Sequence, residues 1–273
     1  MVAALGRRVA EYGAAVNRIE VPAGFDVIRD GRWTLIVQRH ARPWLAPLLR
    51  SIEHPTAAYA PQPLPGGRGG TVRVNAAGHE TVVRPCRRGG LPALVLHDLY
   101  FGRRPRPFAE LAVMATLRQR GVPVVEVYGA AVHWVGPCWY RGWLATCFVP
   151  DALTFWQWAR VPGDAAARAG GLRALGAAVR RLHDGGGAHP DLNANNVLIQ
   201  PAGAPGAAAG TDPSVLFIDF DRARLAAGGQ ATPGTELDRL WRSLRKLDPH
   251  GHCVSAADFD AVRAAYAEAA ACA

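Results

Sequence analysis

Three oxygen-bearing side chains, Asp191, Asn196 and Asp219, stand where they could bind magnesium and orient a hydroxyl group. The first two belong to HPDLNANNVLI at residues 189–199, and the third belongs to LFIDFDRARL at 216–225. Magnesium is a hard ion that keeps several waters and binds through a few carboxylate or amide oxygens together with substrate phosphates. The residue types and their spacing therefore predict transfer of a phosphoryl group to an alcohol.

The same spacing occurs in phosphotransferases of protein-kinase type, where an aspartate on a loop between a helix and a strand orients the attacking hydroxyl. Asp191 matches that aspartate, and Asn196 and Asp219 match the side chains that hold magnesium. A simpler alternative is that Asp191 and Asn193 cap turns and that Asp219 begins one, as Asp and Asn commonly do. Two motifs in the right order favour the catalytic interpretation.

The surrounding pattern predicts the elements that this chemistry needs. Apolar runs at residues 197–199 and 215–218 predict two strands after the Asp191 loop. Helical spacing before the loop predicts a helix, and its apolar positions are Leu172, Leu175, Val179 and Leu182. We expect an α+β, bilobal protein-kinase-like fold with an antiparallel-sheet lobe at 1–149, which carries one key helix, and a mainly helical lobe at 150–273.

A glycine-rich segment, PGGRGGTVRV at residues 65–74, precedes the expected strands of the first lobe. Its backbone N–H groups could close over nucleotide phosphates. The pattern departs from G-x-G-x-x-G, so a flexible hairpin tip explains it equally well. The candidate phosphate-binding glycines are Gly66, Gly67, Gly69 and Gly70.

Arg84 stands in the expected strand 81–85, at the position where protein kinases carry a phosphate-binding lysine. Arginine offers a permanent charge and a planar fork for phosphate oxygens. Glu110, near the start of an expected helix at 106–121, is the candidate partner of Arg84. Its alternative role is that of an acid favourably placed at a helix N-terminus. The expected apolar side of this helix consists of Phe108, Leu111, Met114, Ala115 and Leu117.

The composition bounds the class of protein. The chain has 273 residues, with 49% hydrophobic and 19% charged residues, as expected for a folded protein with a full core. No membrane-spanning stretch or secretory leader is apparent; the first 20 residues resemble an Arg-bearing helix, and we expect a cytosolic protein. Five cysteines without a CxxC pair argue against a disulfide framework or zinc knuckle, and HGHC at 250–253 is expected to be a polar loop.

The formal charge of +9 comes almost wholly from arginine, because Lys246 is the one lysine. A basic surface attracts nucleic acid, acidic lipid or phosphorylated sugars, and charge by itself does not choose among them. No nucleic-acid-binding motif is present, so no nucleic-acid partner is expected. Two groups of arginines flank the Glu110 helix. They either form a solvated face or attract an acidic acceptor. The first group is Arg87 with Arg88, and the second is Arg103 with Arg104 and Arg106.

Several segments together resemble one family. RPCRRGGL, LYFGRRPRPFAEL, GVPV, HPDLNANNVL and IDFDR, in this order, resemble the 3-deoxy-D-manno-octulosonic acid (Kdo) kinases of the lipopolysaccharide kinase family of Gram-negative bacteria. The resemblance spans about residues 66–222, and the combination is more specific than any one motif. Departures are Pro190 after His189, Asn195 where histidine is expected, and an Ala/Gly-rich insert at 201–214.

The resemblance implies an ATP- and Mg²⁺-dependent enzyme that phosphorylates the 4-hydroxyl of Kdo in Kdo-lipid A. It also implies a peripheral position at the anionic cytoplasmic face of the bacterial inner membrane. Within such a family, arginine at position 84 is expected, and the segment Val149 to Asp151 would be the adenine-binding hinge.

Two other functions fit the motifs. A kinase for an aminoglycoside or a choline-like alcohol would share them, but its cationic acceptor would favour an acidic cleft. A kinase-shaped module that binds without catalysis is disfavoured by the intact magnesium-binding residues. The first 60 residues carry no recognisable motif; short strands are expected at 25–29 and 34–38, and the segment Pro43 to Pro65 is interrupted by prolines.

Overall fold

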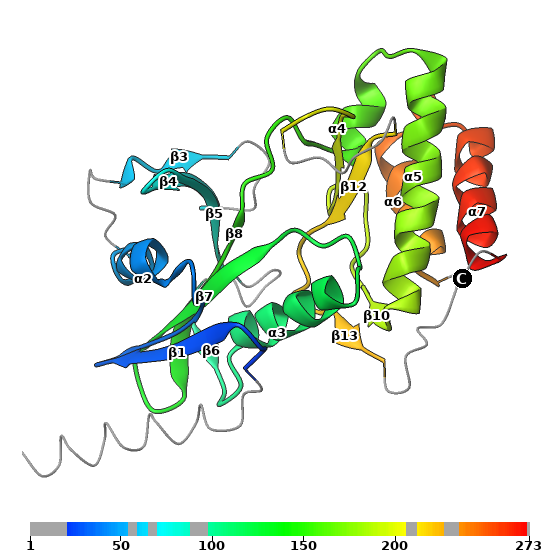
Figure 1. Ribbon diagram of the computed structural model, residues 1–273. Helices are drawn as coiled ribbons and strands as arrows, with labels where there is room; N and C mark the ends of the chain where they lie inside the picture. Colours follow the sequence, from blue (N-terminus) through cyan, green and yellow to red (C-terminus); the bar gives the residue numbers. More distant parts are fainter. Residues whose placement is uncertain are drawn as a thin grey trace, which may run out of the picture. The chain divides into compact units, whose positions relative to one another are not determined.

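The main sheet is antiparallel and grows from β-branched and aromatic runs in the first half of the chain. The computed structural model describes residues 21–53, 59–64, 70–87, 98–205, 212–226 and 235–271. In this part of the chain the strand order is β1-β2-β7-β8-β5-β4-β3, with β6 paired to β8 (Figure 1). The strands are β1 (Phe25–Asp30), β2 (Trp33–Gln38), β3 (Gln62–Pro63), β4 (Val72–Ala76), β5 (His79–Pro85), β6 (Tyr100–Phe101), β7 (Val127–Trp134) and β8 (Trp139–Cys147).

The chain divides into two units, each with its own internal packing. The segment Thr116–Val125 belongs with the second unit, unlike in the predicted division at residue 149. Backbone bonds explain this: Val125 N donates to Phe217 O at 3.2 Å, and Phe217 N donates to Pro123 O at 2.8 Å. The first unit comprises Met1–Ala115 and Glu126–Phe148, and the second comprises Thr116–Val125 and Val149–Ala273.

Helix α2 (Arg42–Arg50) occupies the first third of the proline-interrupted segment, where the sequence did not predict a helix. Pro43 lies in the first turn, where a missing N–H and a fixed φ are compatible with a helix. Pro47 lies inside the helix and removes one intrahelical hydrogen bond. The apolar face compensates, because it is buried on the sheet. The strands β1 and β2, which were predicted, extend the sheet at β7.

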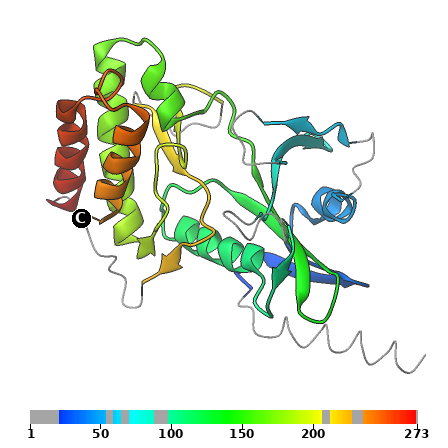
Figure 2. The ribbon, with the colours of Figure 1, turned by 180° about the vertical axis from the view of Figure 1, so that it is seen from behind.

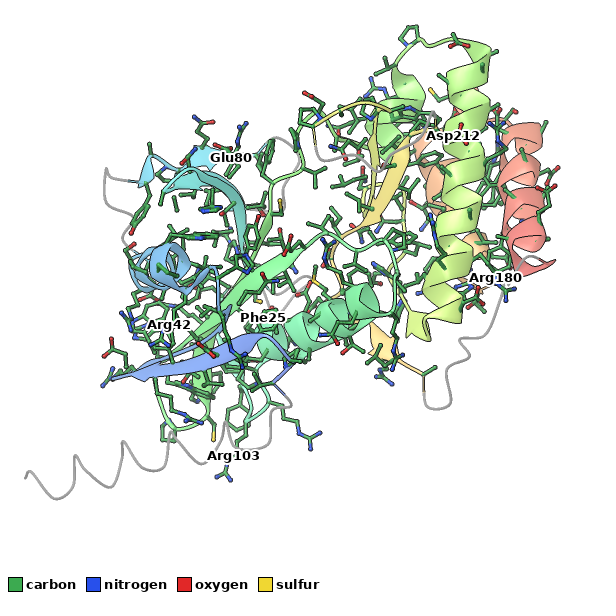
Figure 3. The ribbon with its side chains drawn as sticks, viewed as in Figure 1. Phe25, Arg42, Glu80, Arg103, Arg180 and Asp212 are labelled. Atoms are coloured by element: carbon green, nitrogen blue, oxygen red, sulfur yellow. The ribbon has the colours of Figure 1, made fainter. Side chains whose placement is uncertain are left out.

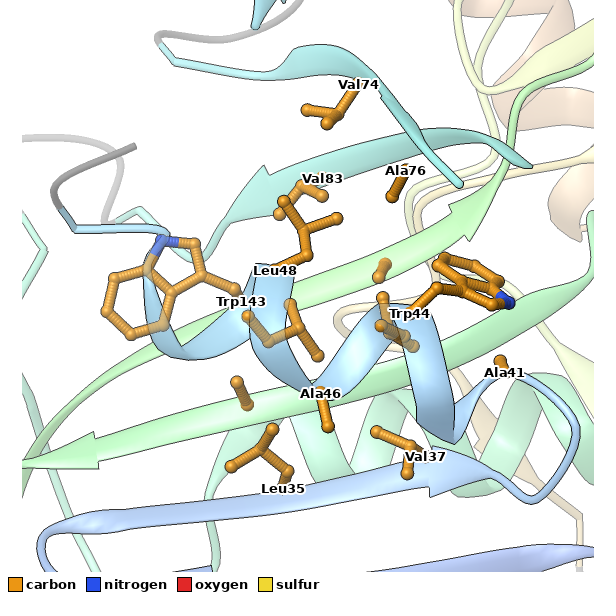
Figure 4. Close-up of a cluster of buried hydrophobic side chains, with 14 residues drawn as sticks. Leu35, Val37, Ala41, Trp44, Ala46, Leu48, Val74, Ala76, Val83 and Trp143 are labelled. Atoms are coloured by element: carbon orange, nitrogen blue, oxygen red, sulfur yellow. The ribbon is translucent and has the colours of Figure 1, made fainter. Parts of the chain in front are cut away.

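The core of the first unit lies between α2 and one face of the sheet. Figure 4 shows α2 packed over the strands, with Leu48 and Trp44 directed toward side chains of the sheet. A Cβ on Gly129 would lie 2.8 Å from Leu45 Cδ2, so helix and sheet are in close contact. Further members of the cluster are Leu35, Val37, Ala41, Ala46, Leu49, Val74, Ala76, Val83, Ala131, Trp143 and Ala145.

The opposite face of the sheet carries helix α3 (Arg106–Gln119). Successive residues of a strand point to opposite faces, so Val83 joins the core under α2 and Arg84 lies on the other face. Pro107 of α3 lies so near β8 that a Cβ on Gly142 would be 2.8 Å from its Cγ. The predicted apolar side of this helix is confirmed, because Phe108, Leu111, Met114, Ala115 and Leu117 are all buried.

The second unit is mainly helical, as predicted. Asp164 caps α5 by accepting a hydrogen bond from Ala166 N at 2.6 Å, and Thr154 forms a capping box with Gln157 at the start of α4. No described helix is long and apolar enough to cross a bilayer. The elements are α4 (Phe155–Arg160), α5 (Ala165–Asp184), α6 (Thr235–Leu247), α7 (Ala256–Ala271), β9 (Leu153–Thr154), β10 (Gly187–Ala188), β11 (Val197–Gln200), β12 (Ser214–Phe217) and β13 (Arg224–Leu225).

Helices α5 and α7 run side by side (Figures 1 and 2). A Cβ on Gly176 of α5 would overlap the backbone carbonyl of Val262 in α7, so only glycine permits this approach. A buried polar group joins three helices: His183 Nδ1 lies 2.8 Å from the Tyr266 hydroxyl, and His183 Nε2 lies 3.5 Å from Glu236 Oε2. The predicted inward positions Leu172, Leu175, Val179 and Leu182 are buried.

We expect Leu48→Ala to lower the free energy of unfolding by about 2–5 kcal/mol, because the side chain is fully buried between α2 and the sheet and its truncation leaves a cavity. Arg42→Ala in the same helix removes an exposed ion pair with Asp26 and should cost less than about 1 kcal/mol. Denaturant unfolding of both variants measures the difference. Equal, small effects would show that α2 contributes little to the core.

Candidate active site

The segment from His189 to Asn196 forms a loop between β10 and β11 that its own asparagines hold together. Asn193 Nδ2 donates to Asp191 O at 2.8 Å, and Asn193 Oδ1 accepts from Asn195 N at 2.9 Å. Asn193 therefore caps a turn, as the simpler alternative for this segment had it. The Asp191 side chain takes no part in this capping, and its carboxylate is 52% exposed. The loop therefore fixes the backbone of Asp191 and leaves its carboxylate accessible to a substrate.

Asn196 is buried and oriented by the same loop. Its Nδ2 donates to Asp191 O at 3.0 Å, and its backbone N donates to Asn193 O at 3.0 Å. An amide side chain has one donor end and one acceptor end. Because the nitrogen is engaged with Asp191, the oxygen is the end that a metal ion would meet. This orientation suits the predicted role of Asn196 as a magnesium ligand.

Ile218 connects this loop to the second motif. Its N–H donates to Asn196 O at 3.0 Å, and its carbonyl accepts from His189 Nε2 at 3.1 Å. Strand pairing continues the connection, since Val197 of β11 lies opposite Phe217 of β12. We call these two hydrogen bonds, from Ile218 N–H to Asn196 O and from His189 Nε2 to Ile218 O, the Ile218 clamp. Asp219 is the next residue, so the clamp brings the three predicted catalytic residues of this unit onto adjoining loops.

Asp219 has a backbone φ of +63°, in the left-handed region that non-glycine residues rarely occupy. Such a conformation costs about 1–3 kcal/mol and persists only where the surroundings enforce it. The Ile218 clamp lies immediately before the strained residue. Strain of this kind clusters at active sites, so the backbone supports a functional role for Asp219 beyond that of starting a turn.

His189 was not predicted to have a function, although it stands two residues before Asp191. Its side chain is buried and tilts against Phe220, with ring centroids 4.8 Å apart. Burial lowers the pKa of His189, and the hydrogen bond to Ile218 O opposes this in part. A carbonyl accepts only from a protonated nitrogen, so the neutral ring carries its proton on Nε2. His189 is therefore a positioning residue for Ile218.

Arg222 is a second residue whose contact the sequence did not reveal. Its Nε lies 3.6 Å from Asp191 Oδ2, and both side chains are more than half exposed. An exposed ion pair of this kind adds little stability. The effect of the ion pair is local, because it places a positive charge beside the carboxylate that is predicted to orient the attacking hydroxyl.

In the first unit, Arg84 and Glu110 form the predicted ion pair. Arg84 Nη2 lies 2.5 Å from Glu110 Oε1 and 2.7 Å from Oε2. The Glu110 side chain is fully buried, whereas that of Arg84 is 27% exposed. A carboxylate buried to this degree requires a charged partner. The alternative that Glu110 merely favours a helix N-terminus is therefore wrong.

The glycine-rich segment is only partly described. Gly66, Gly67 and Gly69 lie outside the described residues, and their phosphate-binding role stays a prediction. Gly70 has a φ of +94°, a backbone conformation that favours glycine, and a Cβ there would lie 2.6 Å from Nη2 at the flexible end of Arg87. Leu64 N donates to Thr71 O at 3.2 Å, which closes the hairpin between β3 and β4 around the segment.

The HGHC segment is a turn organised by a carboxylate. Asp248 accepts from the backbone N–H groups of His252, Cys253 and Val254 at 2.8–3.0 Å, and these bonds lower its pKa. The rings of His250 and His252 lie 5.6 Å apart. Across the described part of the chain, no cluster of three or more His, Cys, Asp or Glu side chains could hold a metal ion.

Residues 64–266 match the family described as "Lipopolysaccharide kinase (Kdo/WaaP) family". The chain belongs to this family. A relative named 3-deoxy-D-manno-octulosonic acid kinase, from Xanthomonas oryzae pv. oryzae (strain PXO99A), is 35% identical over 185 residues, which cover 67% of this chain and 68% of the relative. A relative with the same name from Xylella fastidiosa (strain M12) is 32% identical over 218 residues, which cover 74% and 76%.

A solved structure described as "WaaP in complex with acyl carrier protein" has a similar fold. The TM-score is 0.55 at 17% identity, and the match covers 86% of this chain and 88% of that one. At this identity the likeness supports the fold only. Together these findings confirm the family, the kinase-like α+β fold and the assignment of the protein as a phosphotransferase.

We expect Arg84→Met to destabilise the first unit by about 3–5 kcal/mol, because it leaves the Glu110 carboxylate buried without a partner. Arg84→Met combined with Glu110→Leu should recover most of this stability, since both partners are then apolar. Phosphotransfer should be abolished in the single variant and in the double variant, because both lack the Arg84 guanidinium that is assigned to the nucleotide phosphates. Unfolding and turnover are measured on the same preparations, and a stable double variant with normal turnover would make the ion pair purely structural.

The lowered pKa of His189 predicts acid sensitivity of the second unit. The unfolded chain binds a proton near pH 6.5, and the folded protein binds it only at lower pH. Stability should therefore fall as the pH decreases from about 6.5 through the folded pKa. His189→Gln places an amide donor near Nε2 without a titrating ring, so the difference in melting temperature between wild type and variant should vary with pH over this range. A constant difference would contradict the assignment.

Proposed function

We propose that the protein transfers the γ-phosphoryl group of ATP to the 4-hydroxyl of Kdo in Kdo-lipid A during synthesis of the lipopolysaccharide inner core. The observation that carries this proposal is the Ile218 clamp, which keeps Asp191, Asn196 and Asp219 on adjoining loops. The choice of Kdo as the acceptor sugar is based on relatives that are named Kdo kinase. The choice of the 4-hydroxyl follows from the resemblance of the motifs.

In the proposed reaction, the sugar hydroxyl attacks the γ-phosphorus in line with the leaving ADP oxygen. A bond forms from the attacking oxygen to phosphorus, and the bond from phosphorus to the β-phosphate oxygen breaks. Asp191 accepts a hydrogen bond from the hydroxyl and receives its proton. Arg222 Nε lies 3.6 Å from Asp191 Oδ2, so a cation stands beside the carboxylate that receives the proton. Positioning and charge stabilisation supply most of the acceleration.

The oxygen ligands fit magnesium. Asn196 offers an amide oxygen whose orientation is set by its bond to Asp191, and Asp219 offers a carboxylate. When bound, magnesium would offset the charge on the β and γ phosphates. Arg84 is assigned to the α and β phosphates, and Glu110 holds its guanidinium in place. The glycine-rich segment with Gly70 is assigned to close over the nucleotide.

An anionic glycolipid suits the charge of the protein. The formal net charge is +9, so both the phosphorylated acceptor and an acidic leaflet attract it. We place the protein at the cytoplasmic face of the bacterial inner membrane as a peripheral protein. Salt should weaken this attachment, because the Debye length shrinks to about 3 Å at 1 M.

Transfer of labelled γ-phosphate from Mg²⁺-ATP to Kdo-lipid A tests the proposal. Asp191→Asn should lower turnover by about 10²–10⁴-fold, because the amide cannot receive the proton. Asp219→Asn should lower it as well while tolerating the left-handed backbone, since asparagine adopts this conformation readily. Asp212→Asn, the same change at an exposed carboxylate of this unit, should retain turnover.

Two acceptors serve as chemical controls. Lipid A without Kdo should receive no label, and Kdo-lipid A lacking the 4-hydroxyl should receive none either. Label on the 4-deoxy acceptor would refute the assigned hydroxyl and leave the acceptor sugar intact. Absence of label on every Kdo acceptor, with folded protein and bound nucleotide, would refute the acceptor and favour another small-molecule alcohol.

A further inference from the structure

One end of the main sheet presents aromatic side chains at its surface. Strand β6 pairs with the start of β8, so that Phe101 lies opposite Trp139 and their ring centroids are 5.1 Å apart. Two backbone bonds hold this end rigid: Gly102 N donates to Cys138 O at 2.8 Å, and Val135 N donates to Trp139 O at 3.0 Å. The aromatic pair is therefore displayed by ordered strands.

These side chains remain unusually accessible. Phe101 is 65% exposed and Val135 is 37% exposed, and both belong to the four large exposed hydrophobic side chains of the described residues. The other two, Val161 and Leu247, lie in the second unit and apart from each other in the chain. Water contact with a phenyl ring of this exposure is unfavourable. The clustering of Phe101, Val135 and Trp139 at one sheet end favours an apolar environment there.

Positive charge flanks the aromatic pair. Arg103 and Arg104 follow β6 directly, are exposed, and form no ion pair within the described residues. Figure 3 shows the Arg103 guanidinium directed outward from the protein. We name Phe101, Arg103, Arg104, Val135 and Trp139 the hairpin patch.

The carboxylates near this end do not pair with the arginines of the patch, because other side chains hold them. Asp98 pairs with Arg141 at 3.0 Å, and Glu53 lies 2.9 Å from His133 and 3.3 Å from Arg141. Arginines of the hairpin patch therefore keep a net positive field at the aromatic end. That field attracts a surface of opposite sign.

We propose that the hairpin patch docks on the surface of an anionic bilayer. Phe101 and Trp139 enter the headgroup region, where amphipathic and aromatic rings are favoured, and Arg103 and Arg104 contact lipid phosphates. The proposal rests on the proposed function in one respect, namely that the acceptor is a membrane lipid. Apolar insertion and basic attraction are each weak, and their combination gives reversible attachment.

The shape of this region favours a bilayer over a protein ligand. A peptide or helix from a partner protein binds in a groove or along a free strand edge, and β6 is only two residues long, too short to pair with a further strand. The first unit contains a cavity of about 360 Å³, and none of the five patch residues lines it. Its lining comes instead from residues such as Val83, Trp143 and Arg141. Insertion of exposed rings into headgroups requires no groove.

Flotation with lipid vesicles tests the docking surface. Wild-type protein should bind vesicles of phosphatidylcholine with phosphatidylglycerol, and binding should weaken in high salt and on pure phosphatidylcholine. Arg103→Ser with Arg104→Ser should weaken binding about 25-fold, since each basic residue near an anionic leaflet contributes about fivefold. Phe101→Ser should weaken it about tenfold through lost apolar insertion.

A matched control lies on α6 in the second unit. Arg242→Ser, Lys246→Ser and Leu247→Ser together remove two exposed cations and one exposed apolar side chain. This variant should bind vesicles almost as wild type does. Loss of binding in the α6 variant with normal binding of the patch variants would overturn the proposal. Equal wild-type binding to neutral and anionic vesicles, or no binding to either, would overturn it as well.

Phosphotransfer separates this proposal from the proposed function. The patch variants should retain wild-type turnover on a water-soluble Kdo glycoside and lose turnover on Kdo-lipid A embedded in anionic vesicles. Equal loss on both acceptors would mean that the patch affects folding or catalysis rather than docking. Should wild type phosphorylate neither acceptor, the proposed function fails, while flotation still decides whether the hairpin patch binds the bilayer.

Discussion

The candidate catalytic loops of the second unit depend on how the backbone N–H and carbonyl of one residue, Ile218, are held. Its N–H is bound by the carbonyl of Asn196, and its carbonyl is bound by the buried His189 ring. Both partners come from the loop that contains Asp191, so the two motifs cannot move independently. The left-handed backbone of Asp219 is the cost of this arrangement, because the residue must turn sharply as soon as the strand ends. Catalytic carboxylates thus rest on main-chain hydrogen bonds, which are short-range and directional.

A different constraint organises the first unit. The alternation of side chains along β5 sends Val83 into the core under α2 and Arg84 to the face that carries α3. A slip of one residue in this strand would exchange these positions and would bury a guanidinium in an apolar core. Register of β5 is set by its pairing with β8, where Arg84 lies opposite Leu144. Core packing on one face therefore fixes the place of the charge on the other.

Each unit builds its share of the chemistry from contacts inside that unit. The Arg84–Glu110 pair needs only the sheet and α3, and the Ile218 clamp needs only the loops beside β11 and β12. Local construction suits an arginine at position 84, because its charge is permanent and the buried Glu110 carboxylate fixes its direction. Arg103 and Arg104 of the hairpin patch, by contrast, are exposed and are not held by a buried carboxylate, so they can attract an anionic surface.

The sequence by itself identified the candidate residues for the proposed chemistry. Asp191, Asn196, Asp219, Arg84 and Glu110 stand in short motifs whose turns and strands are encoded locally. It also indicated the family, the order of the predicted strands and the inward face of the α3 and α5 helices. Helix α2 was missed because two prolines lower its local propensity, and packing on the sheet outweighs that propensity. Only the tertiary structure decided the contacts of His189 with Ile218 and of Arg222 with Asp191, the orientation of the Asn196 amide, and the exposure of the hairpin patch. These features depend on neighbours distant in the chain, and no local pattern specifies which distant groups will meet.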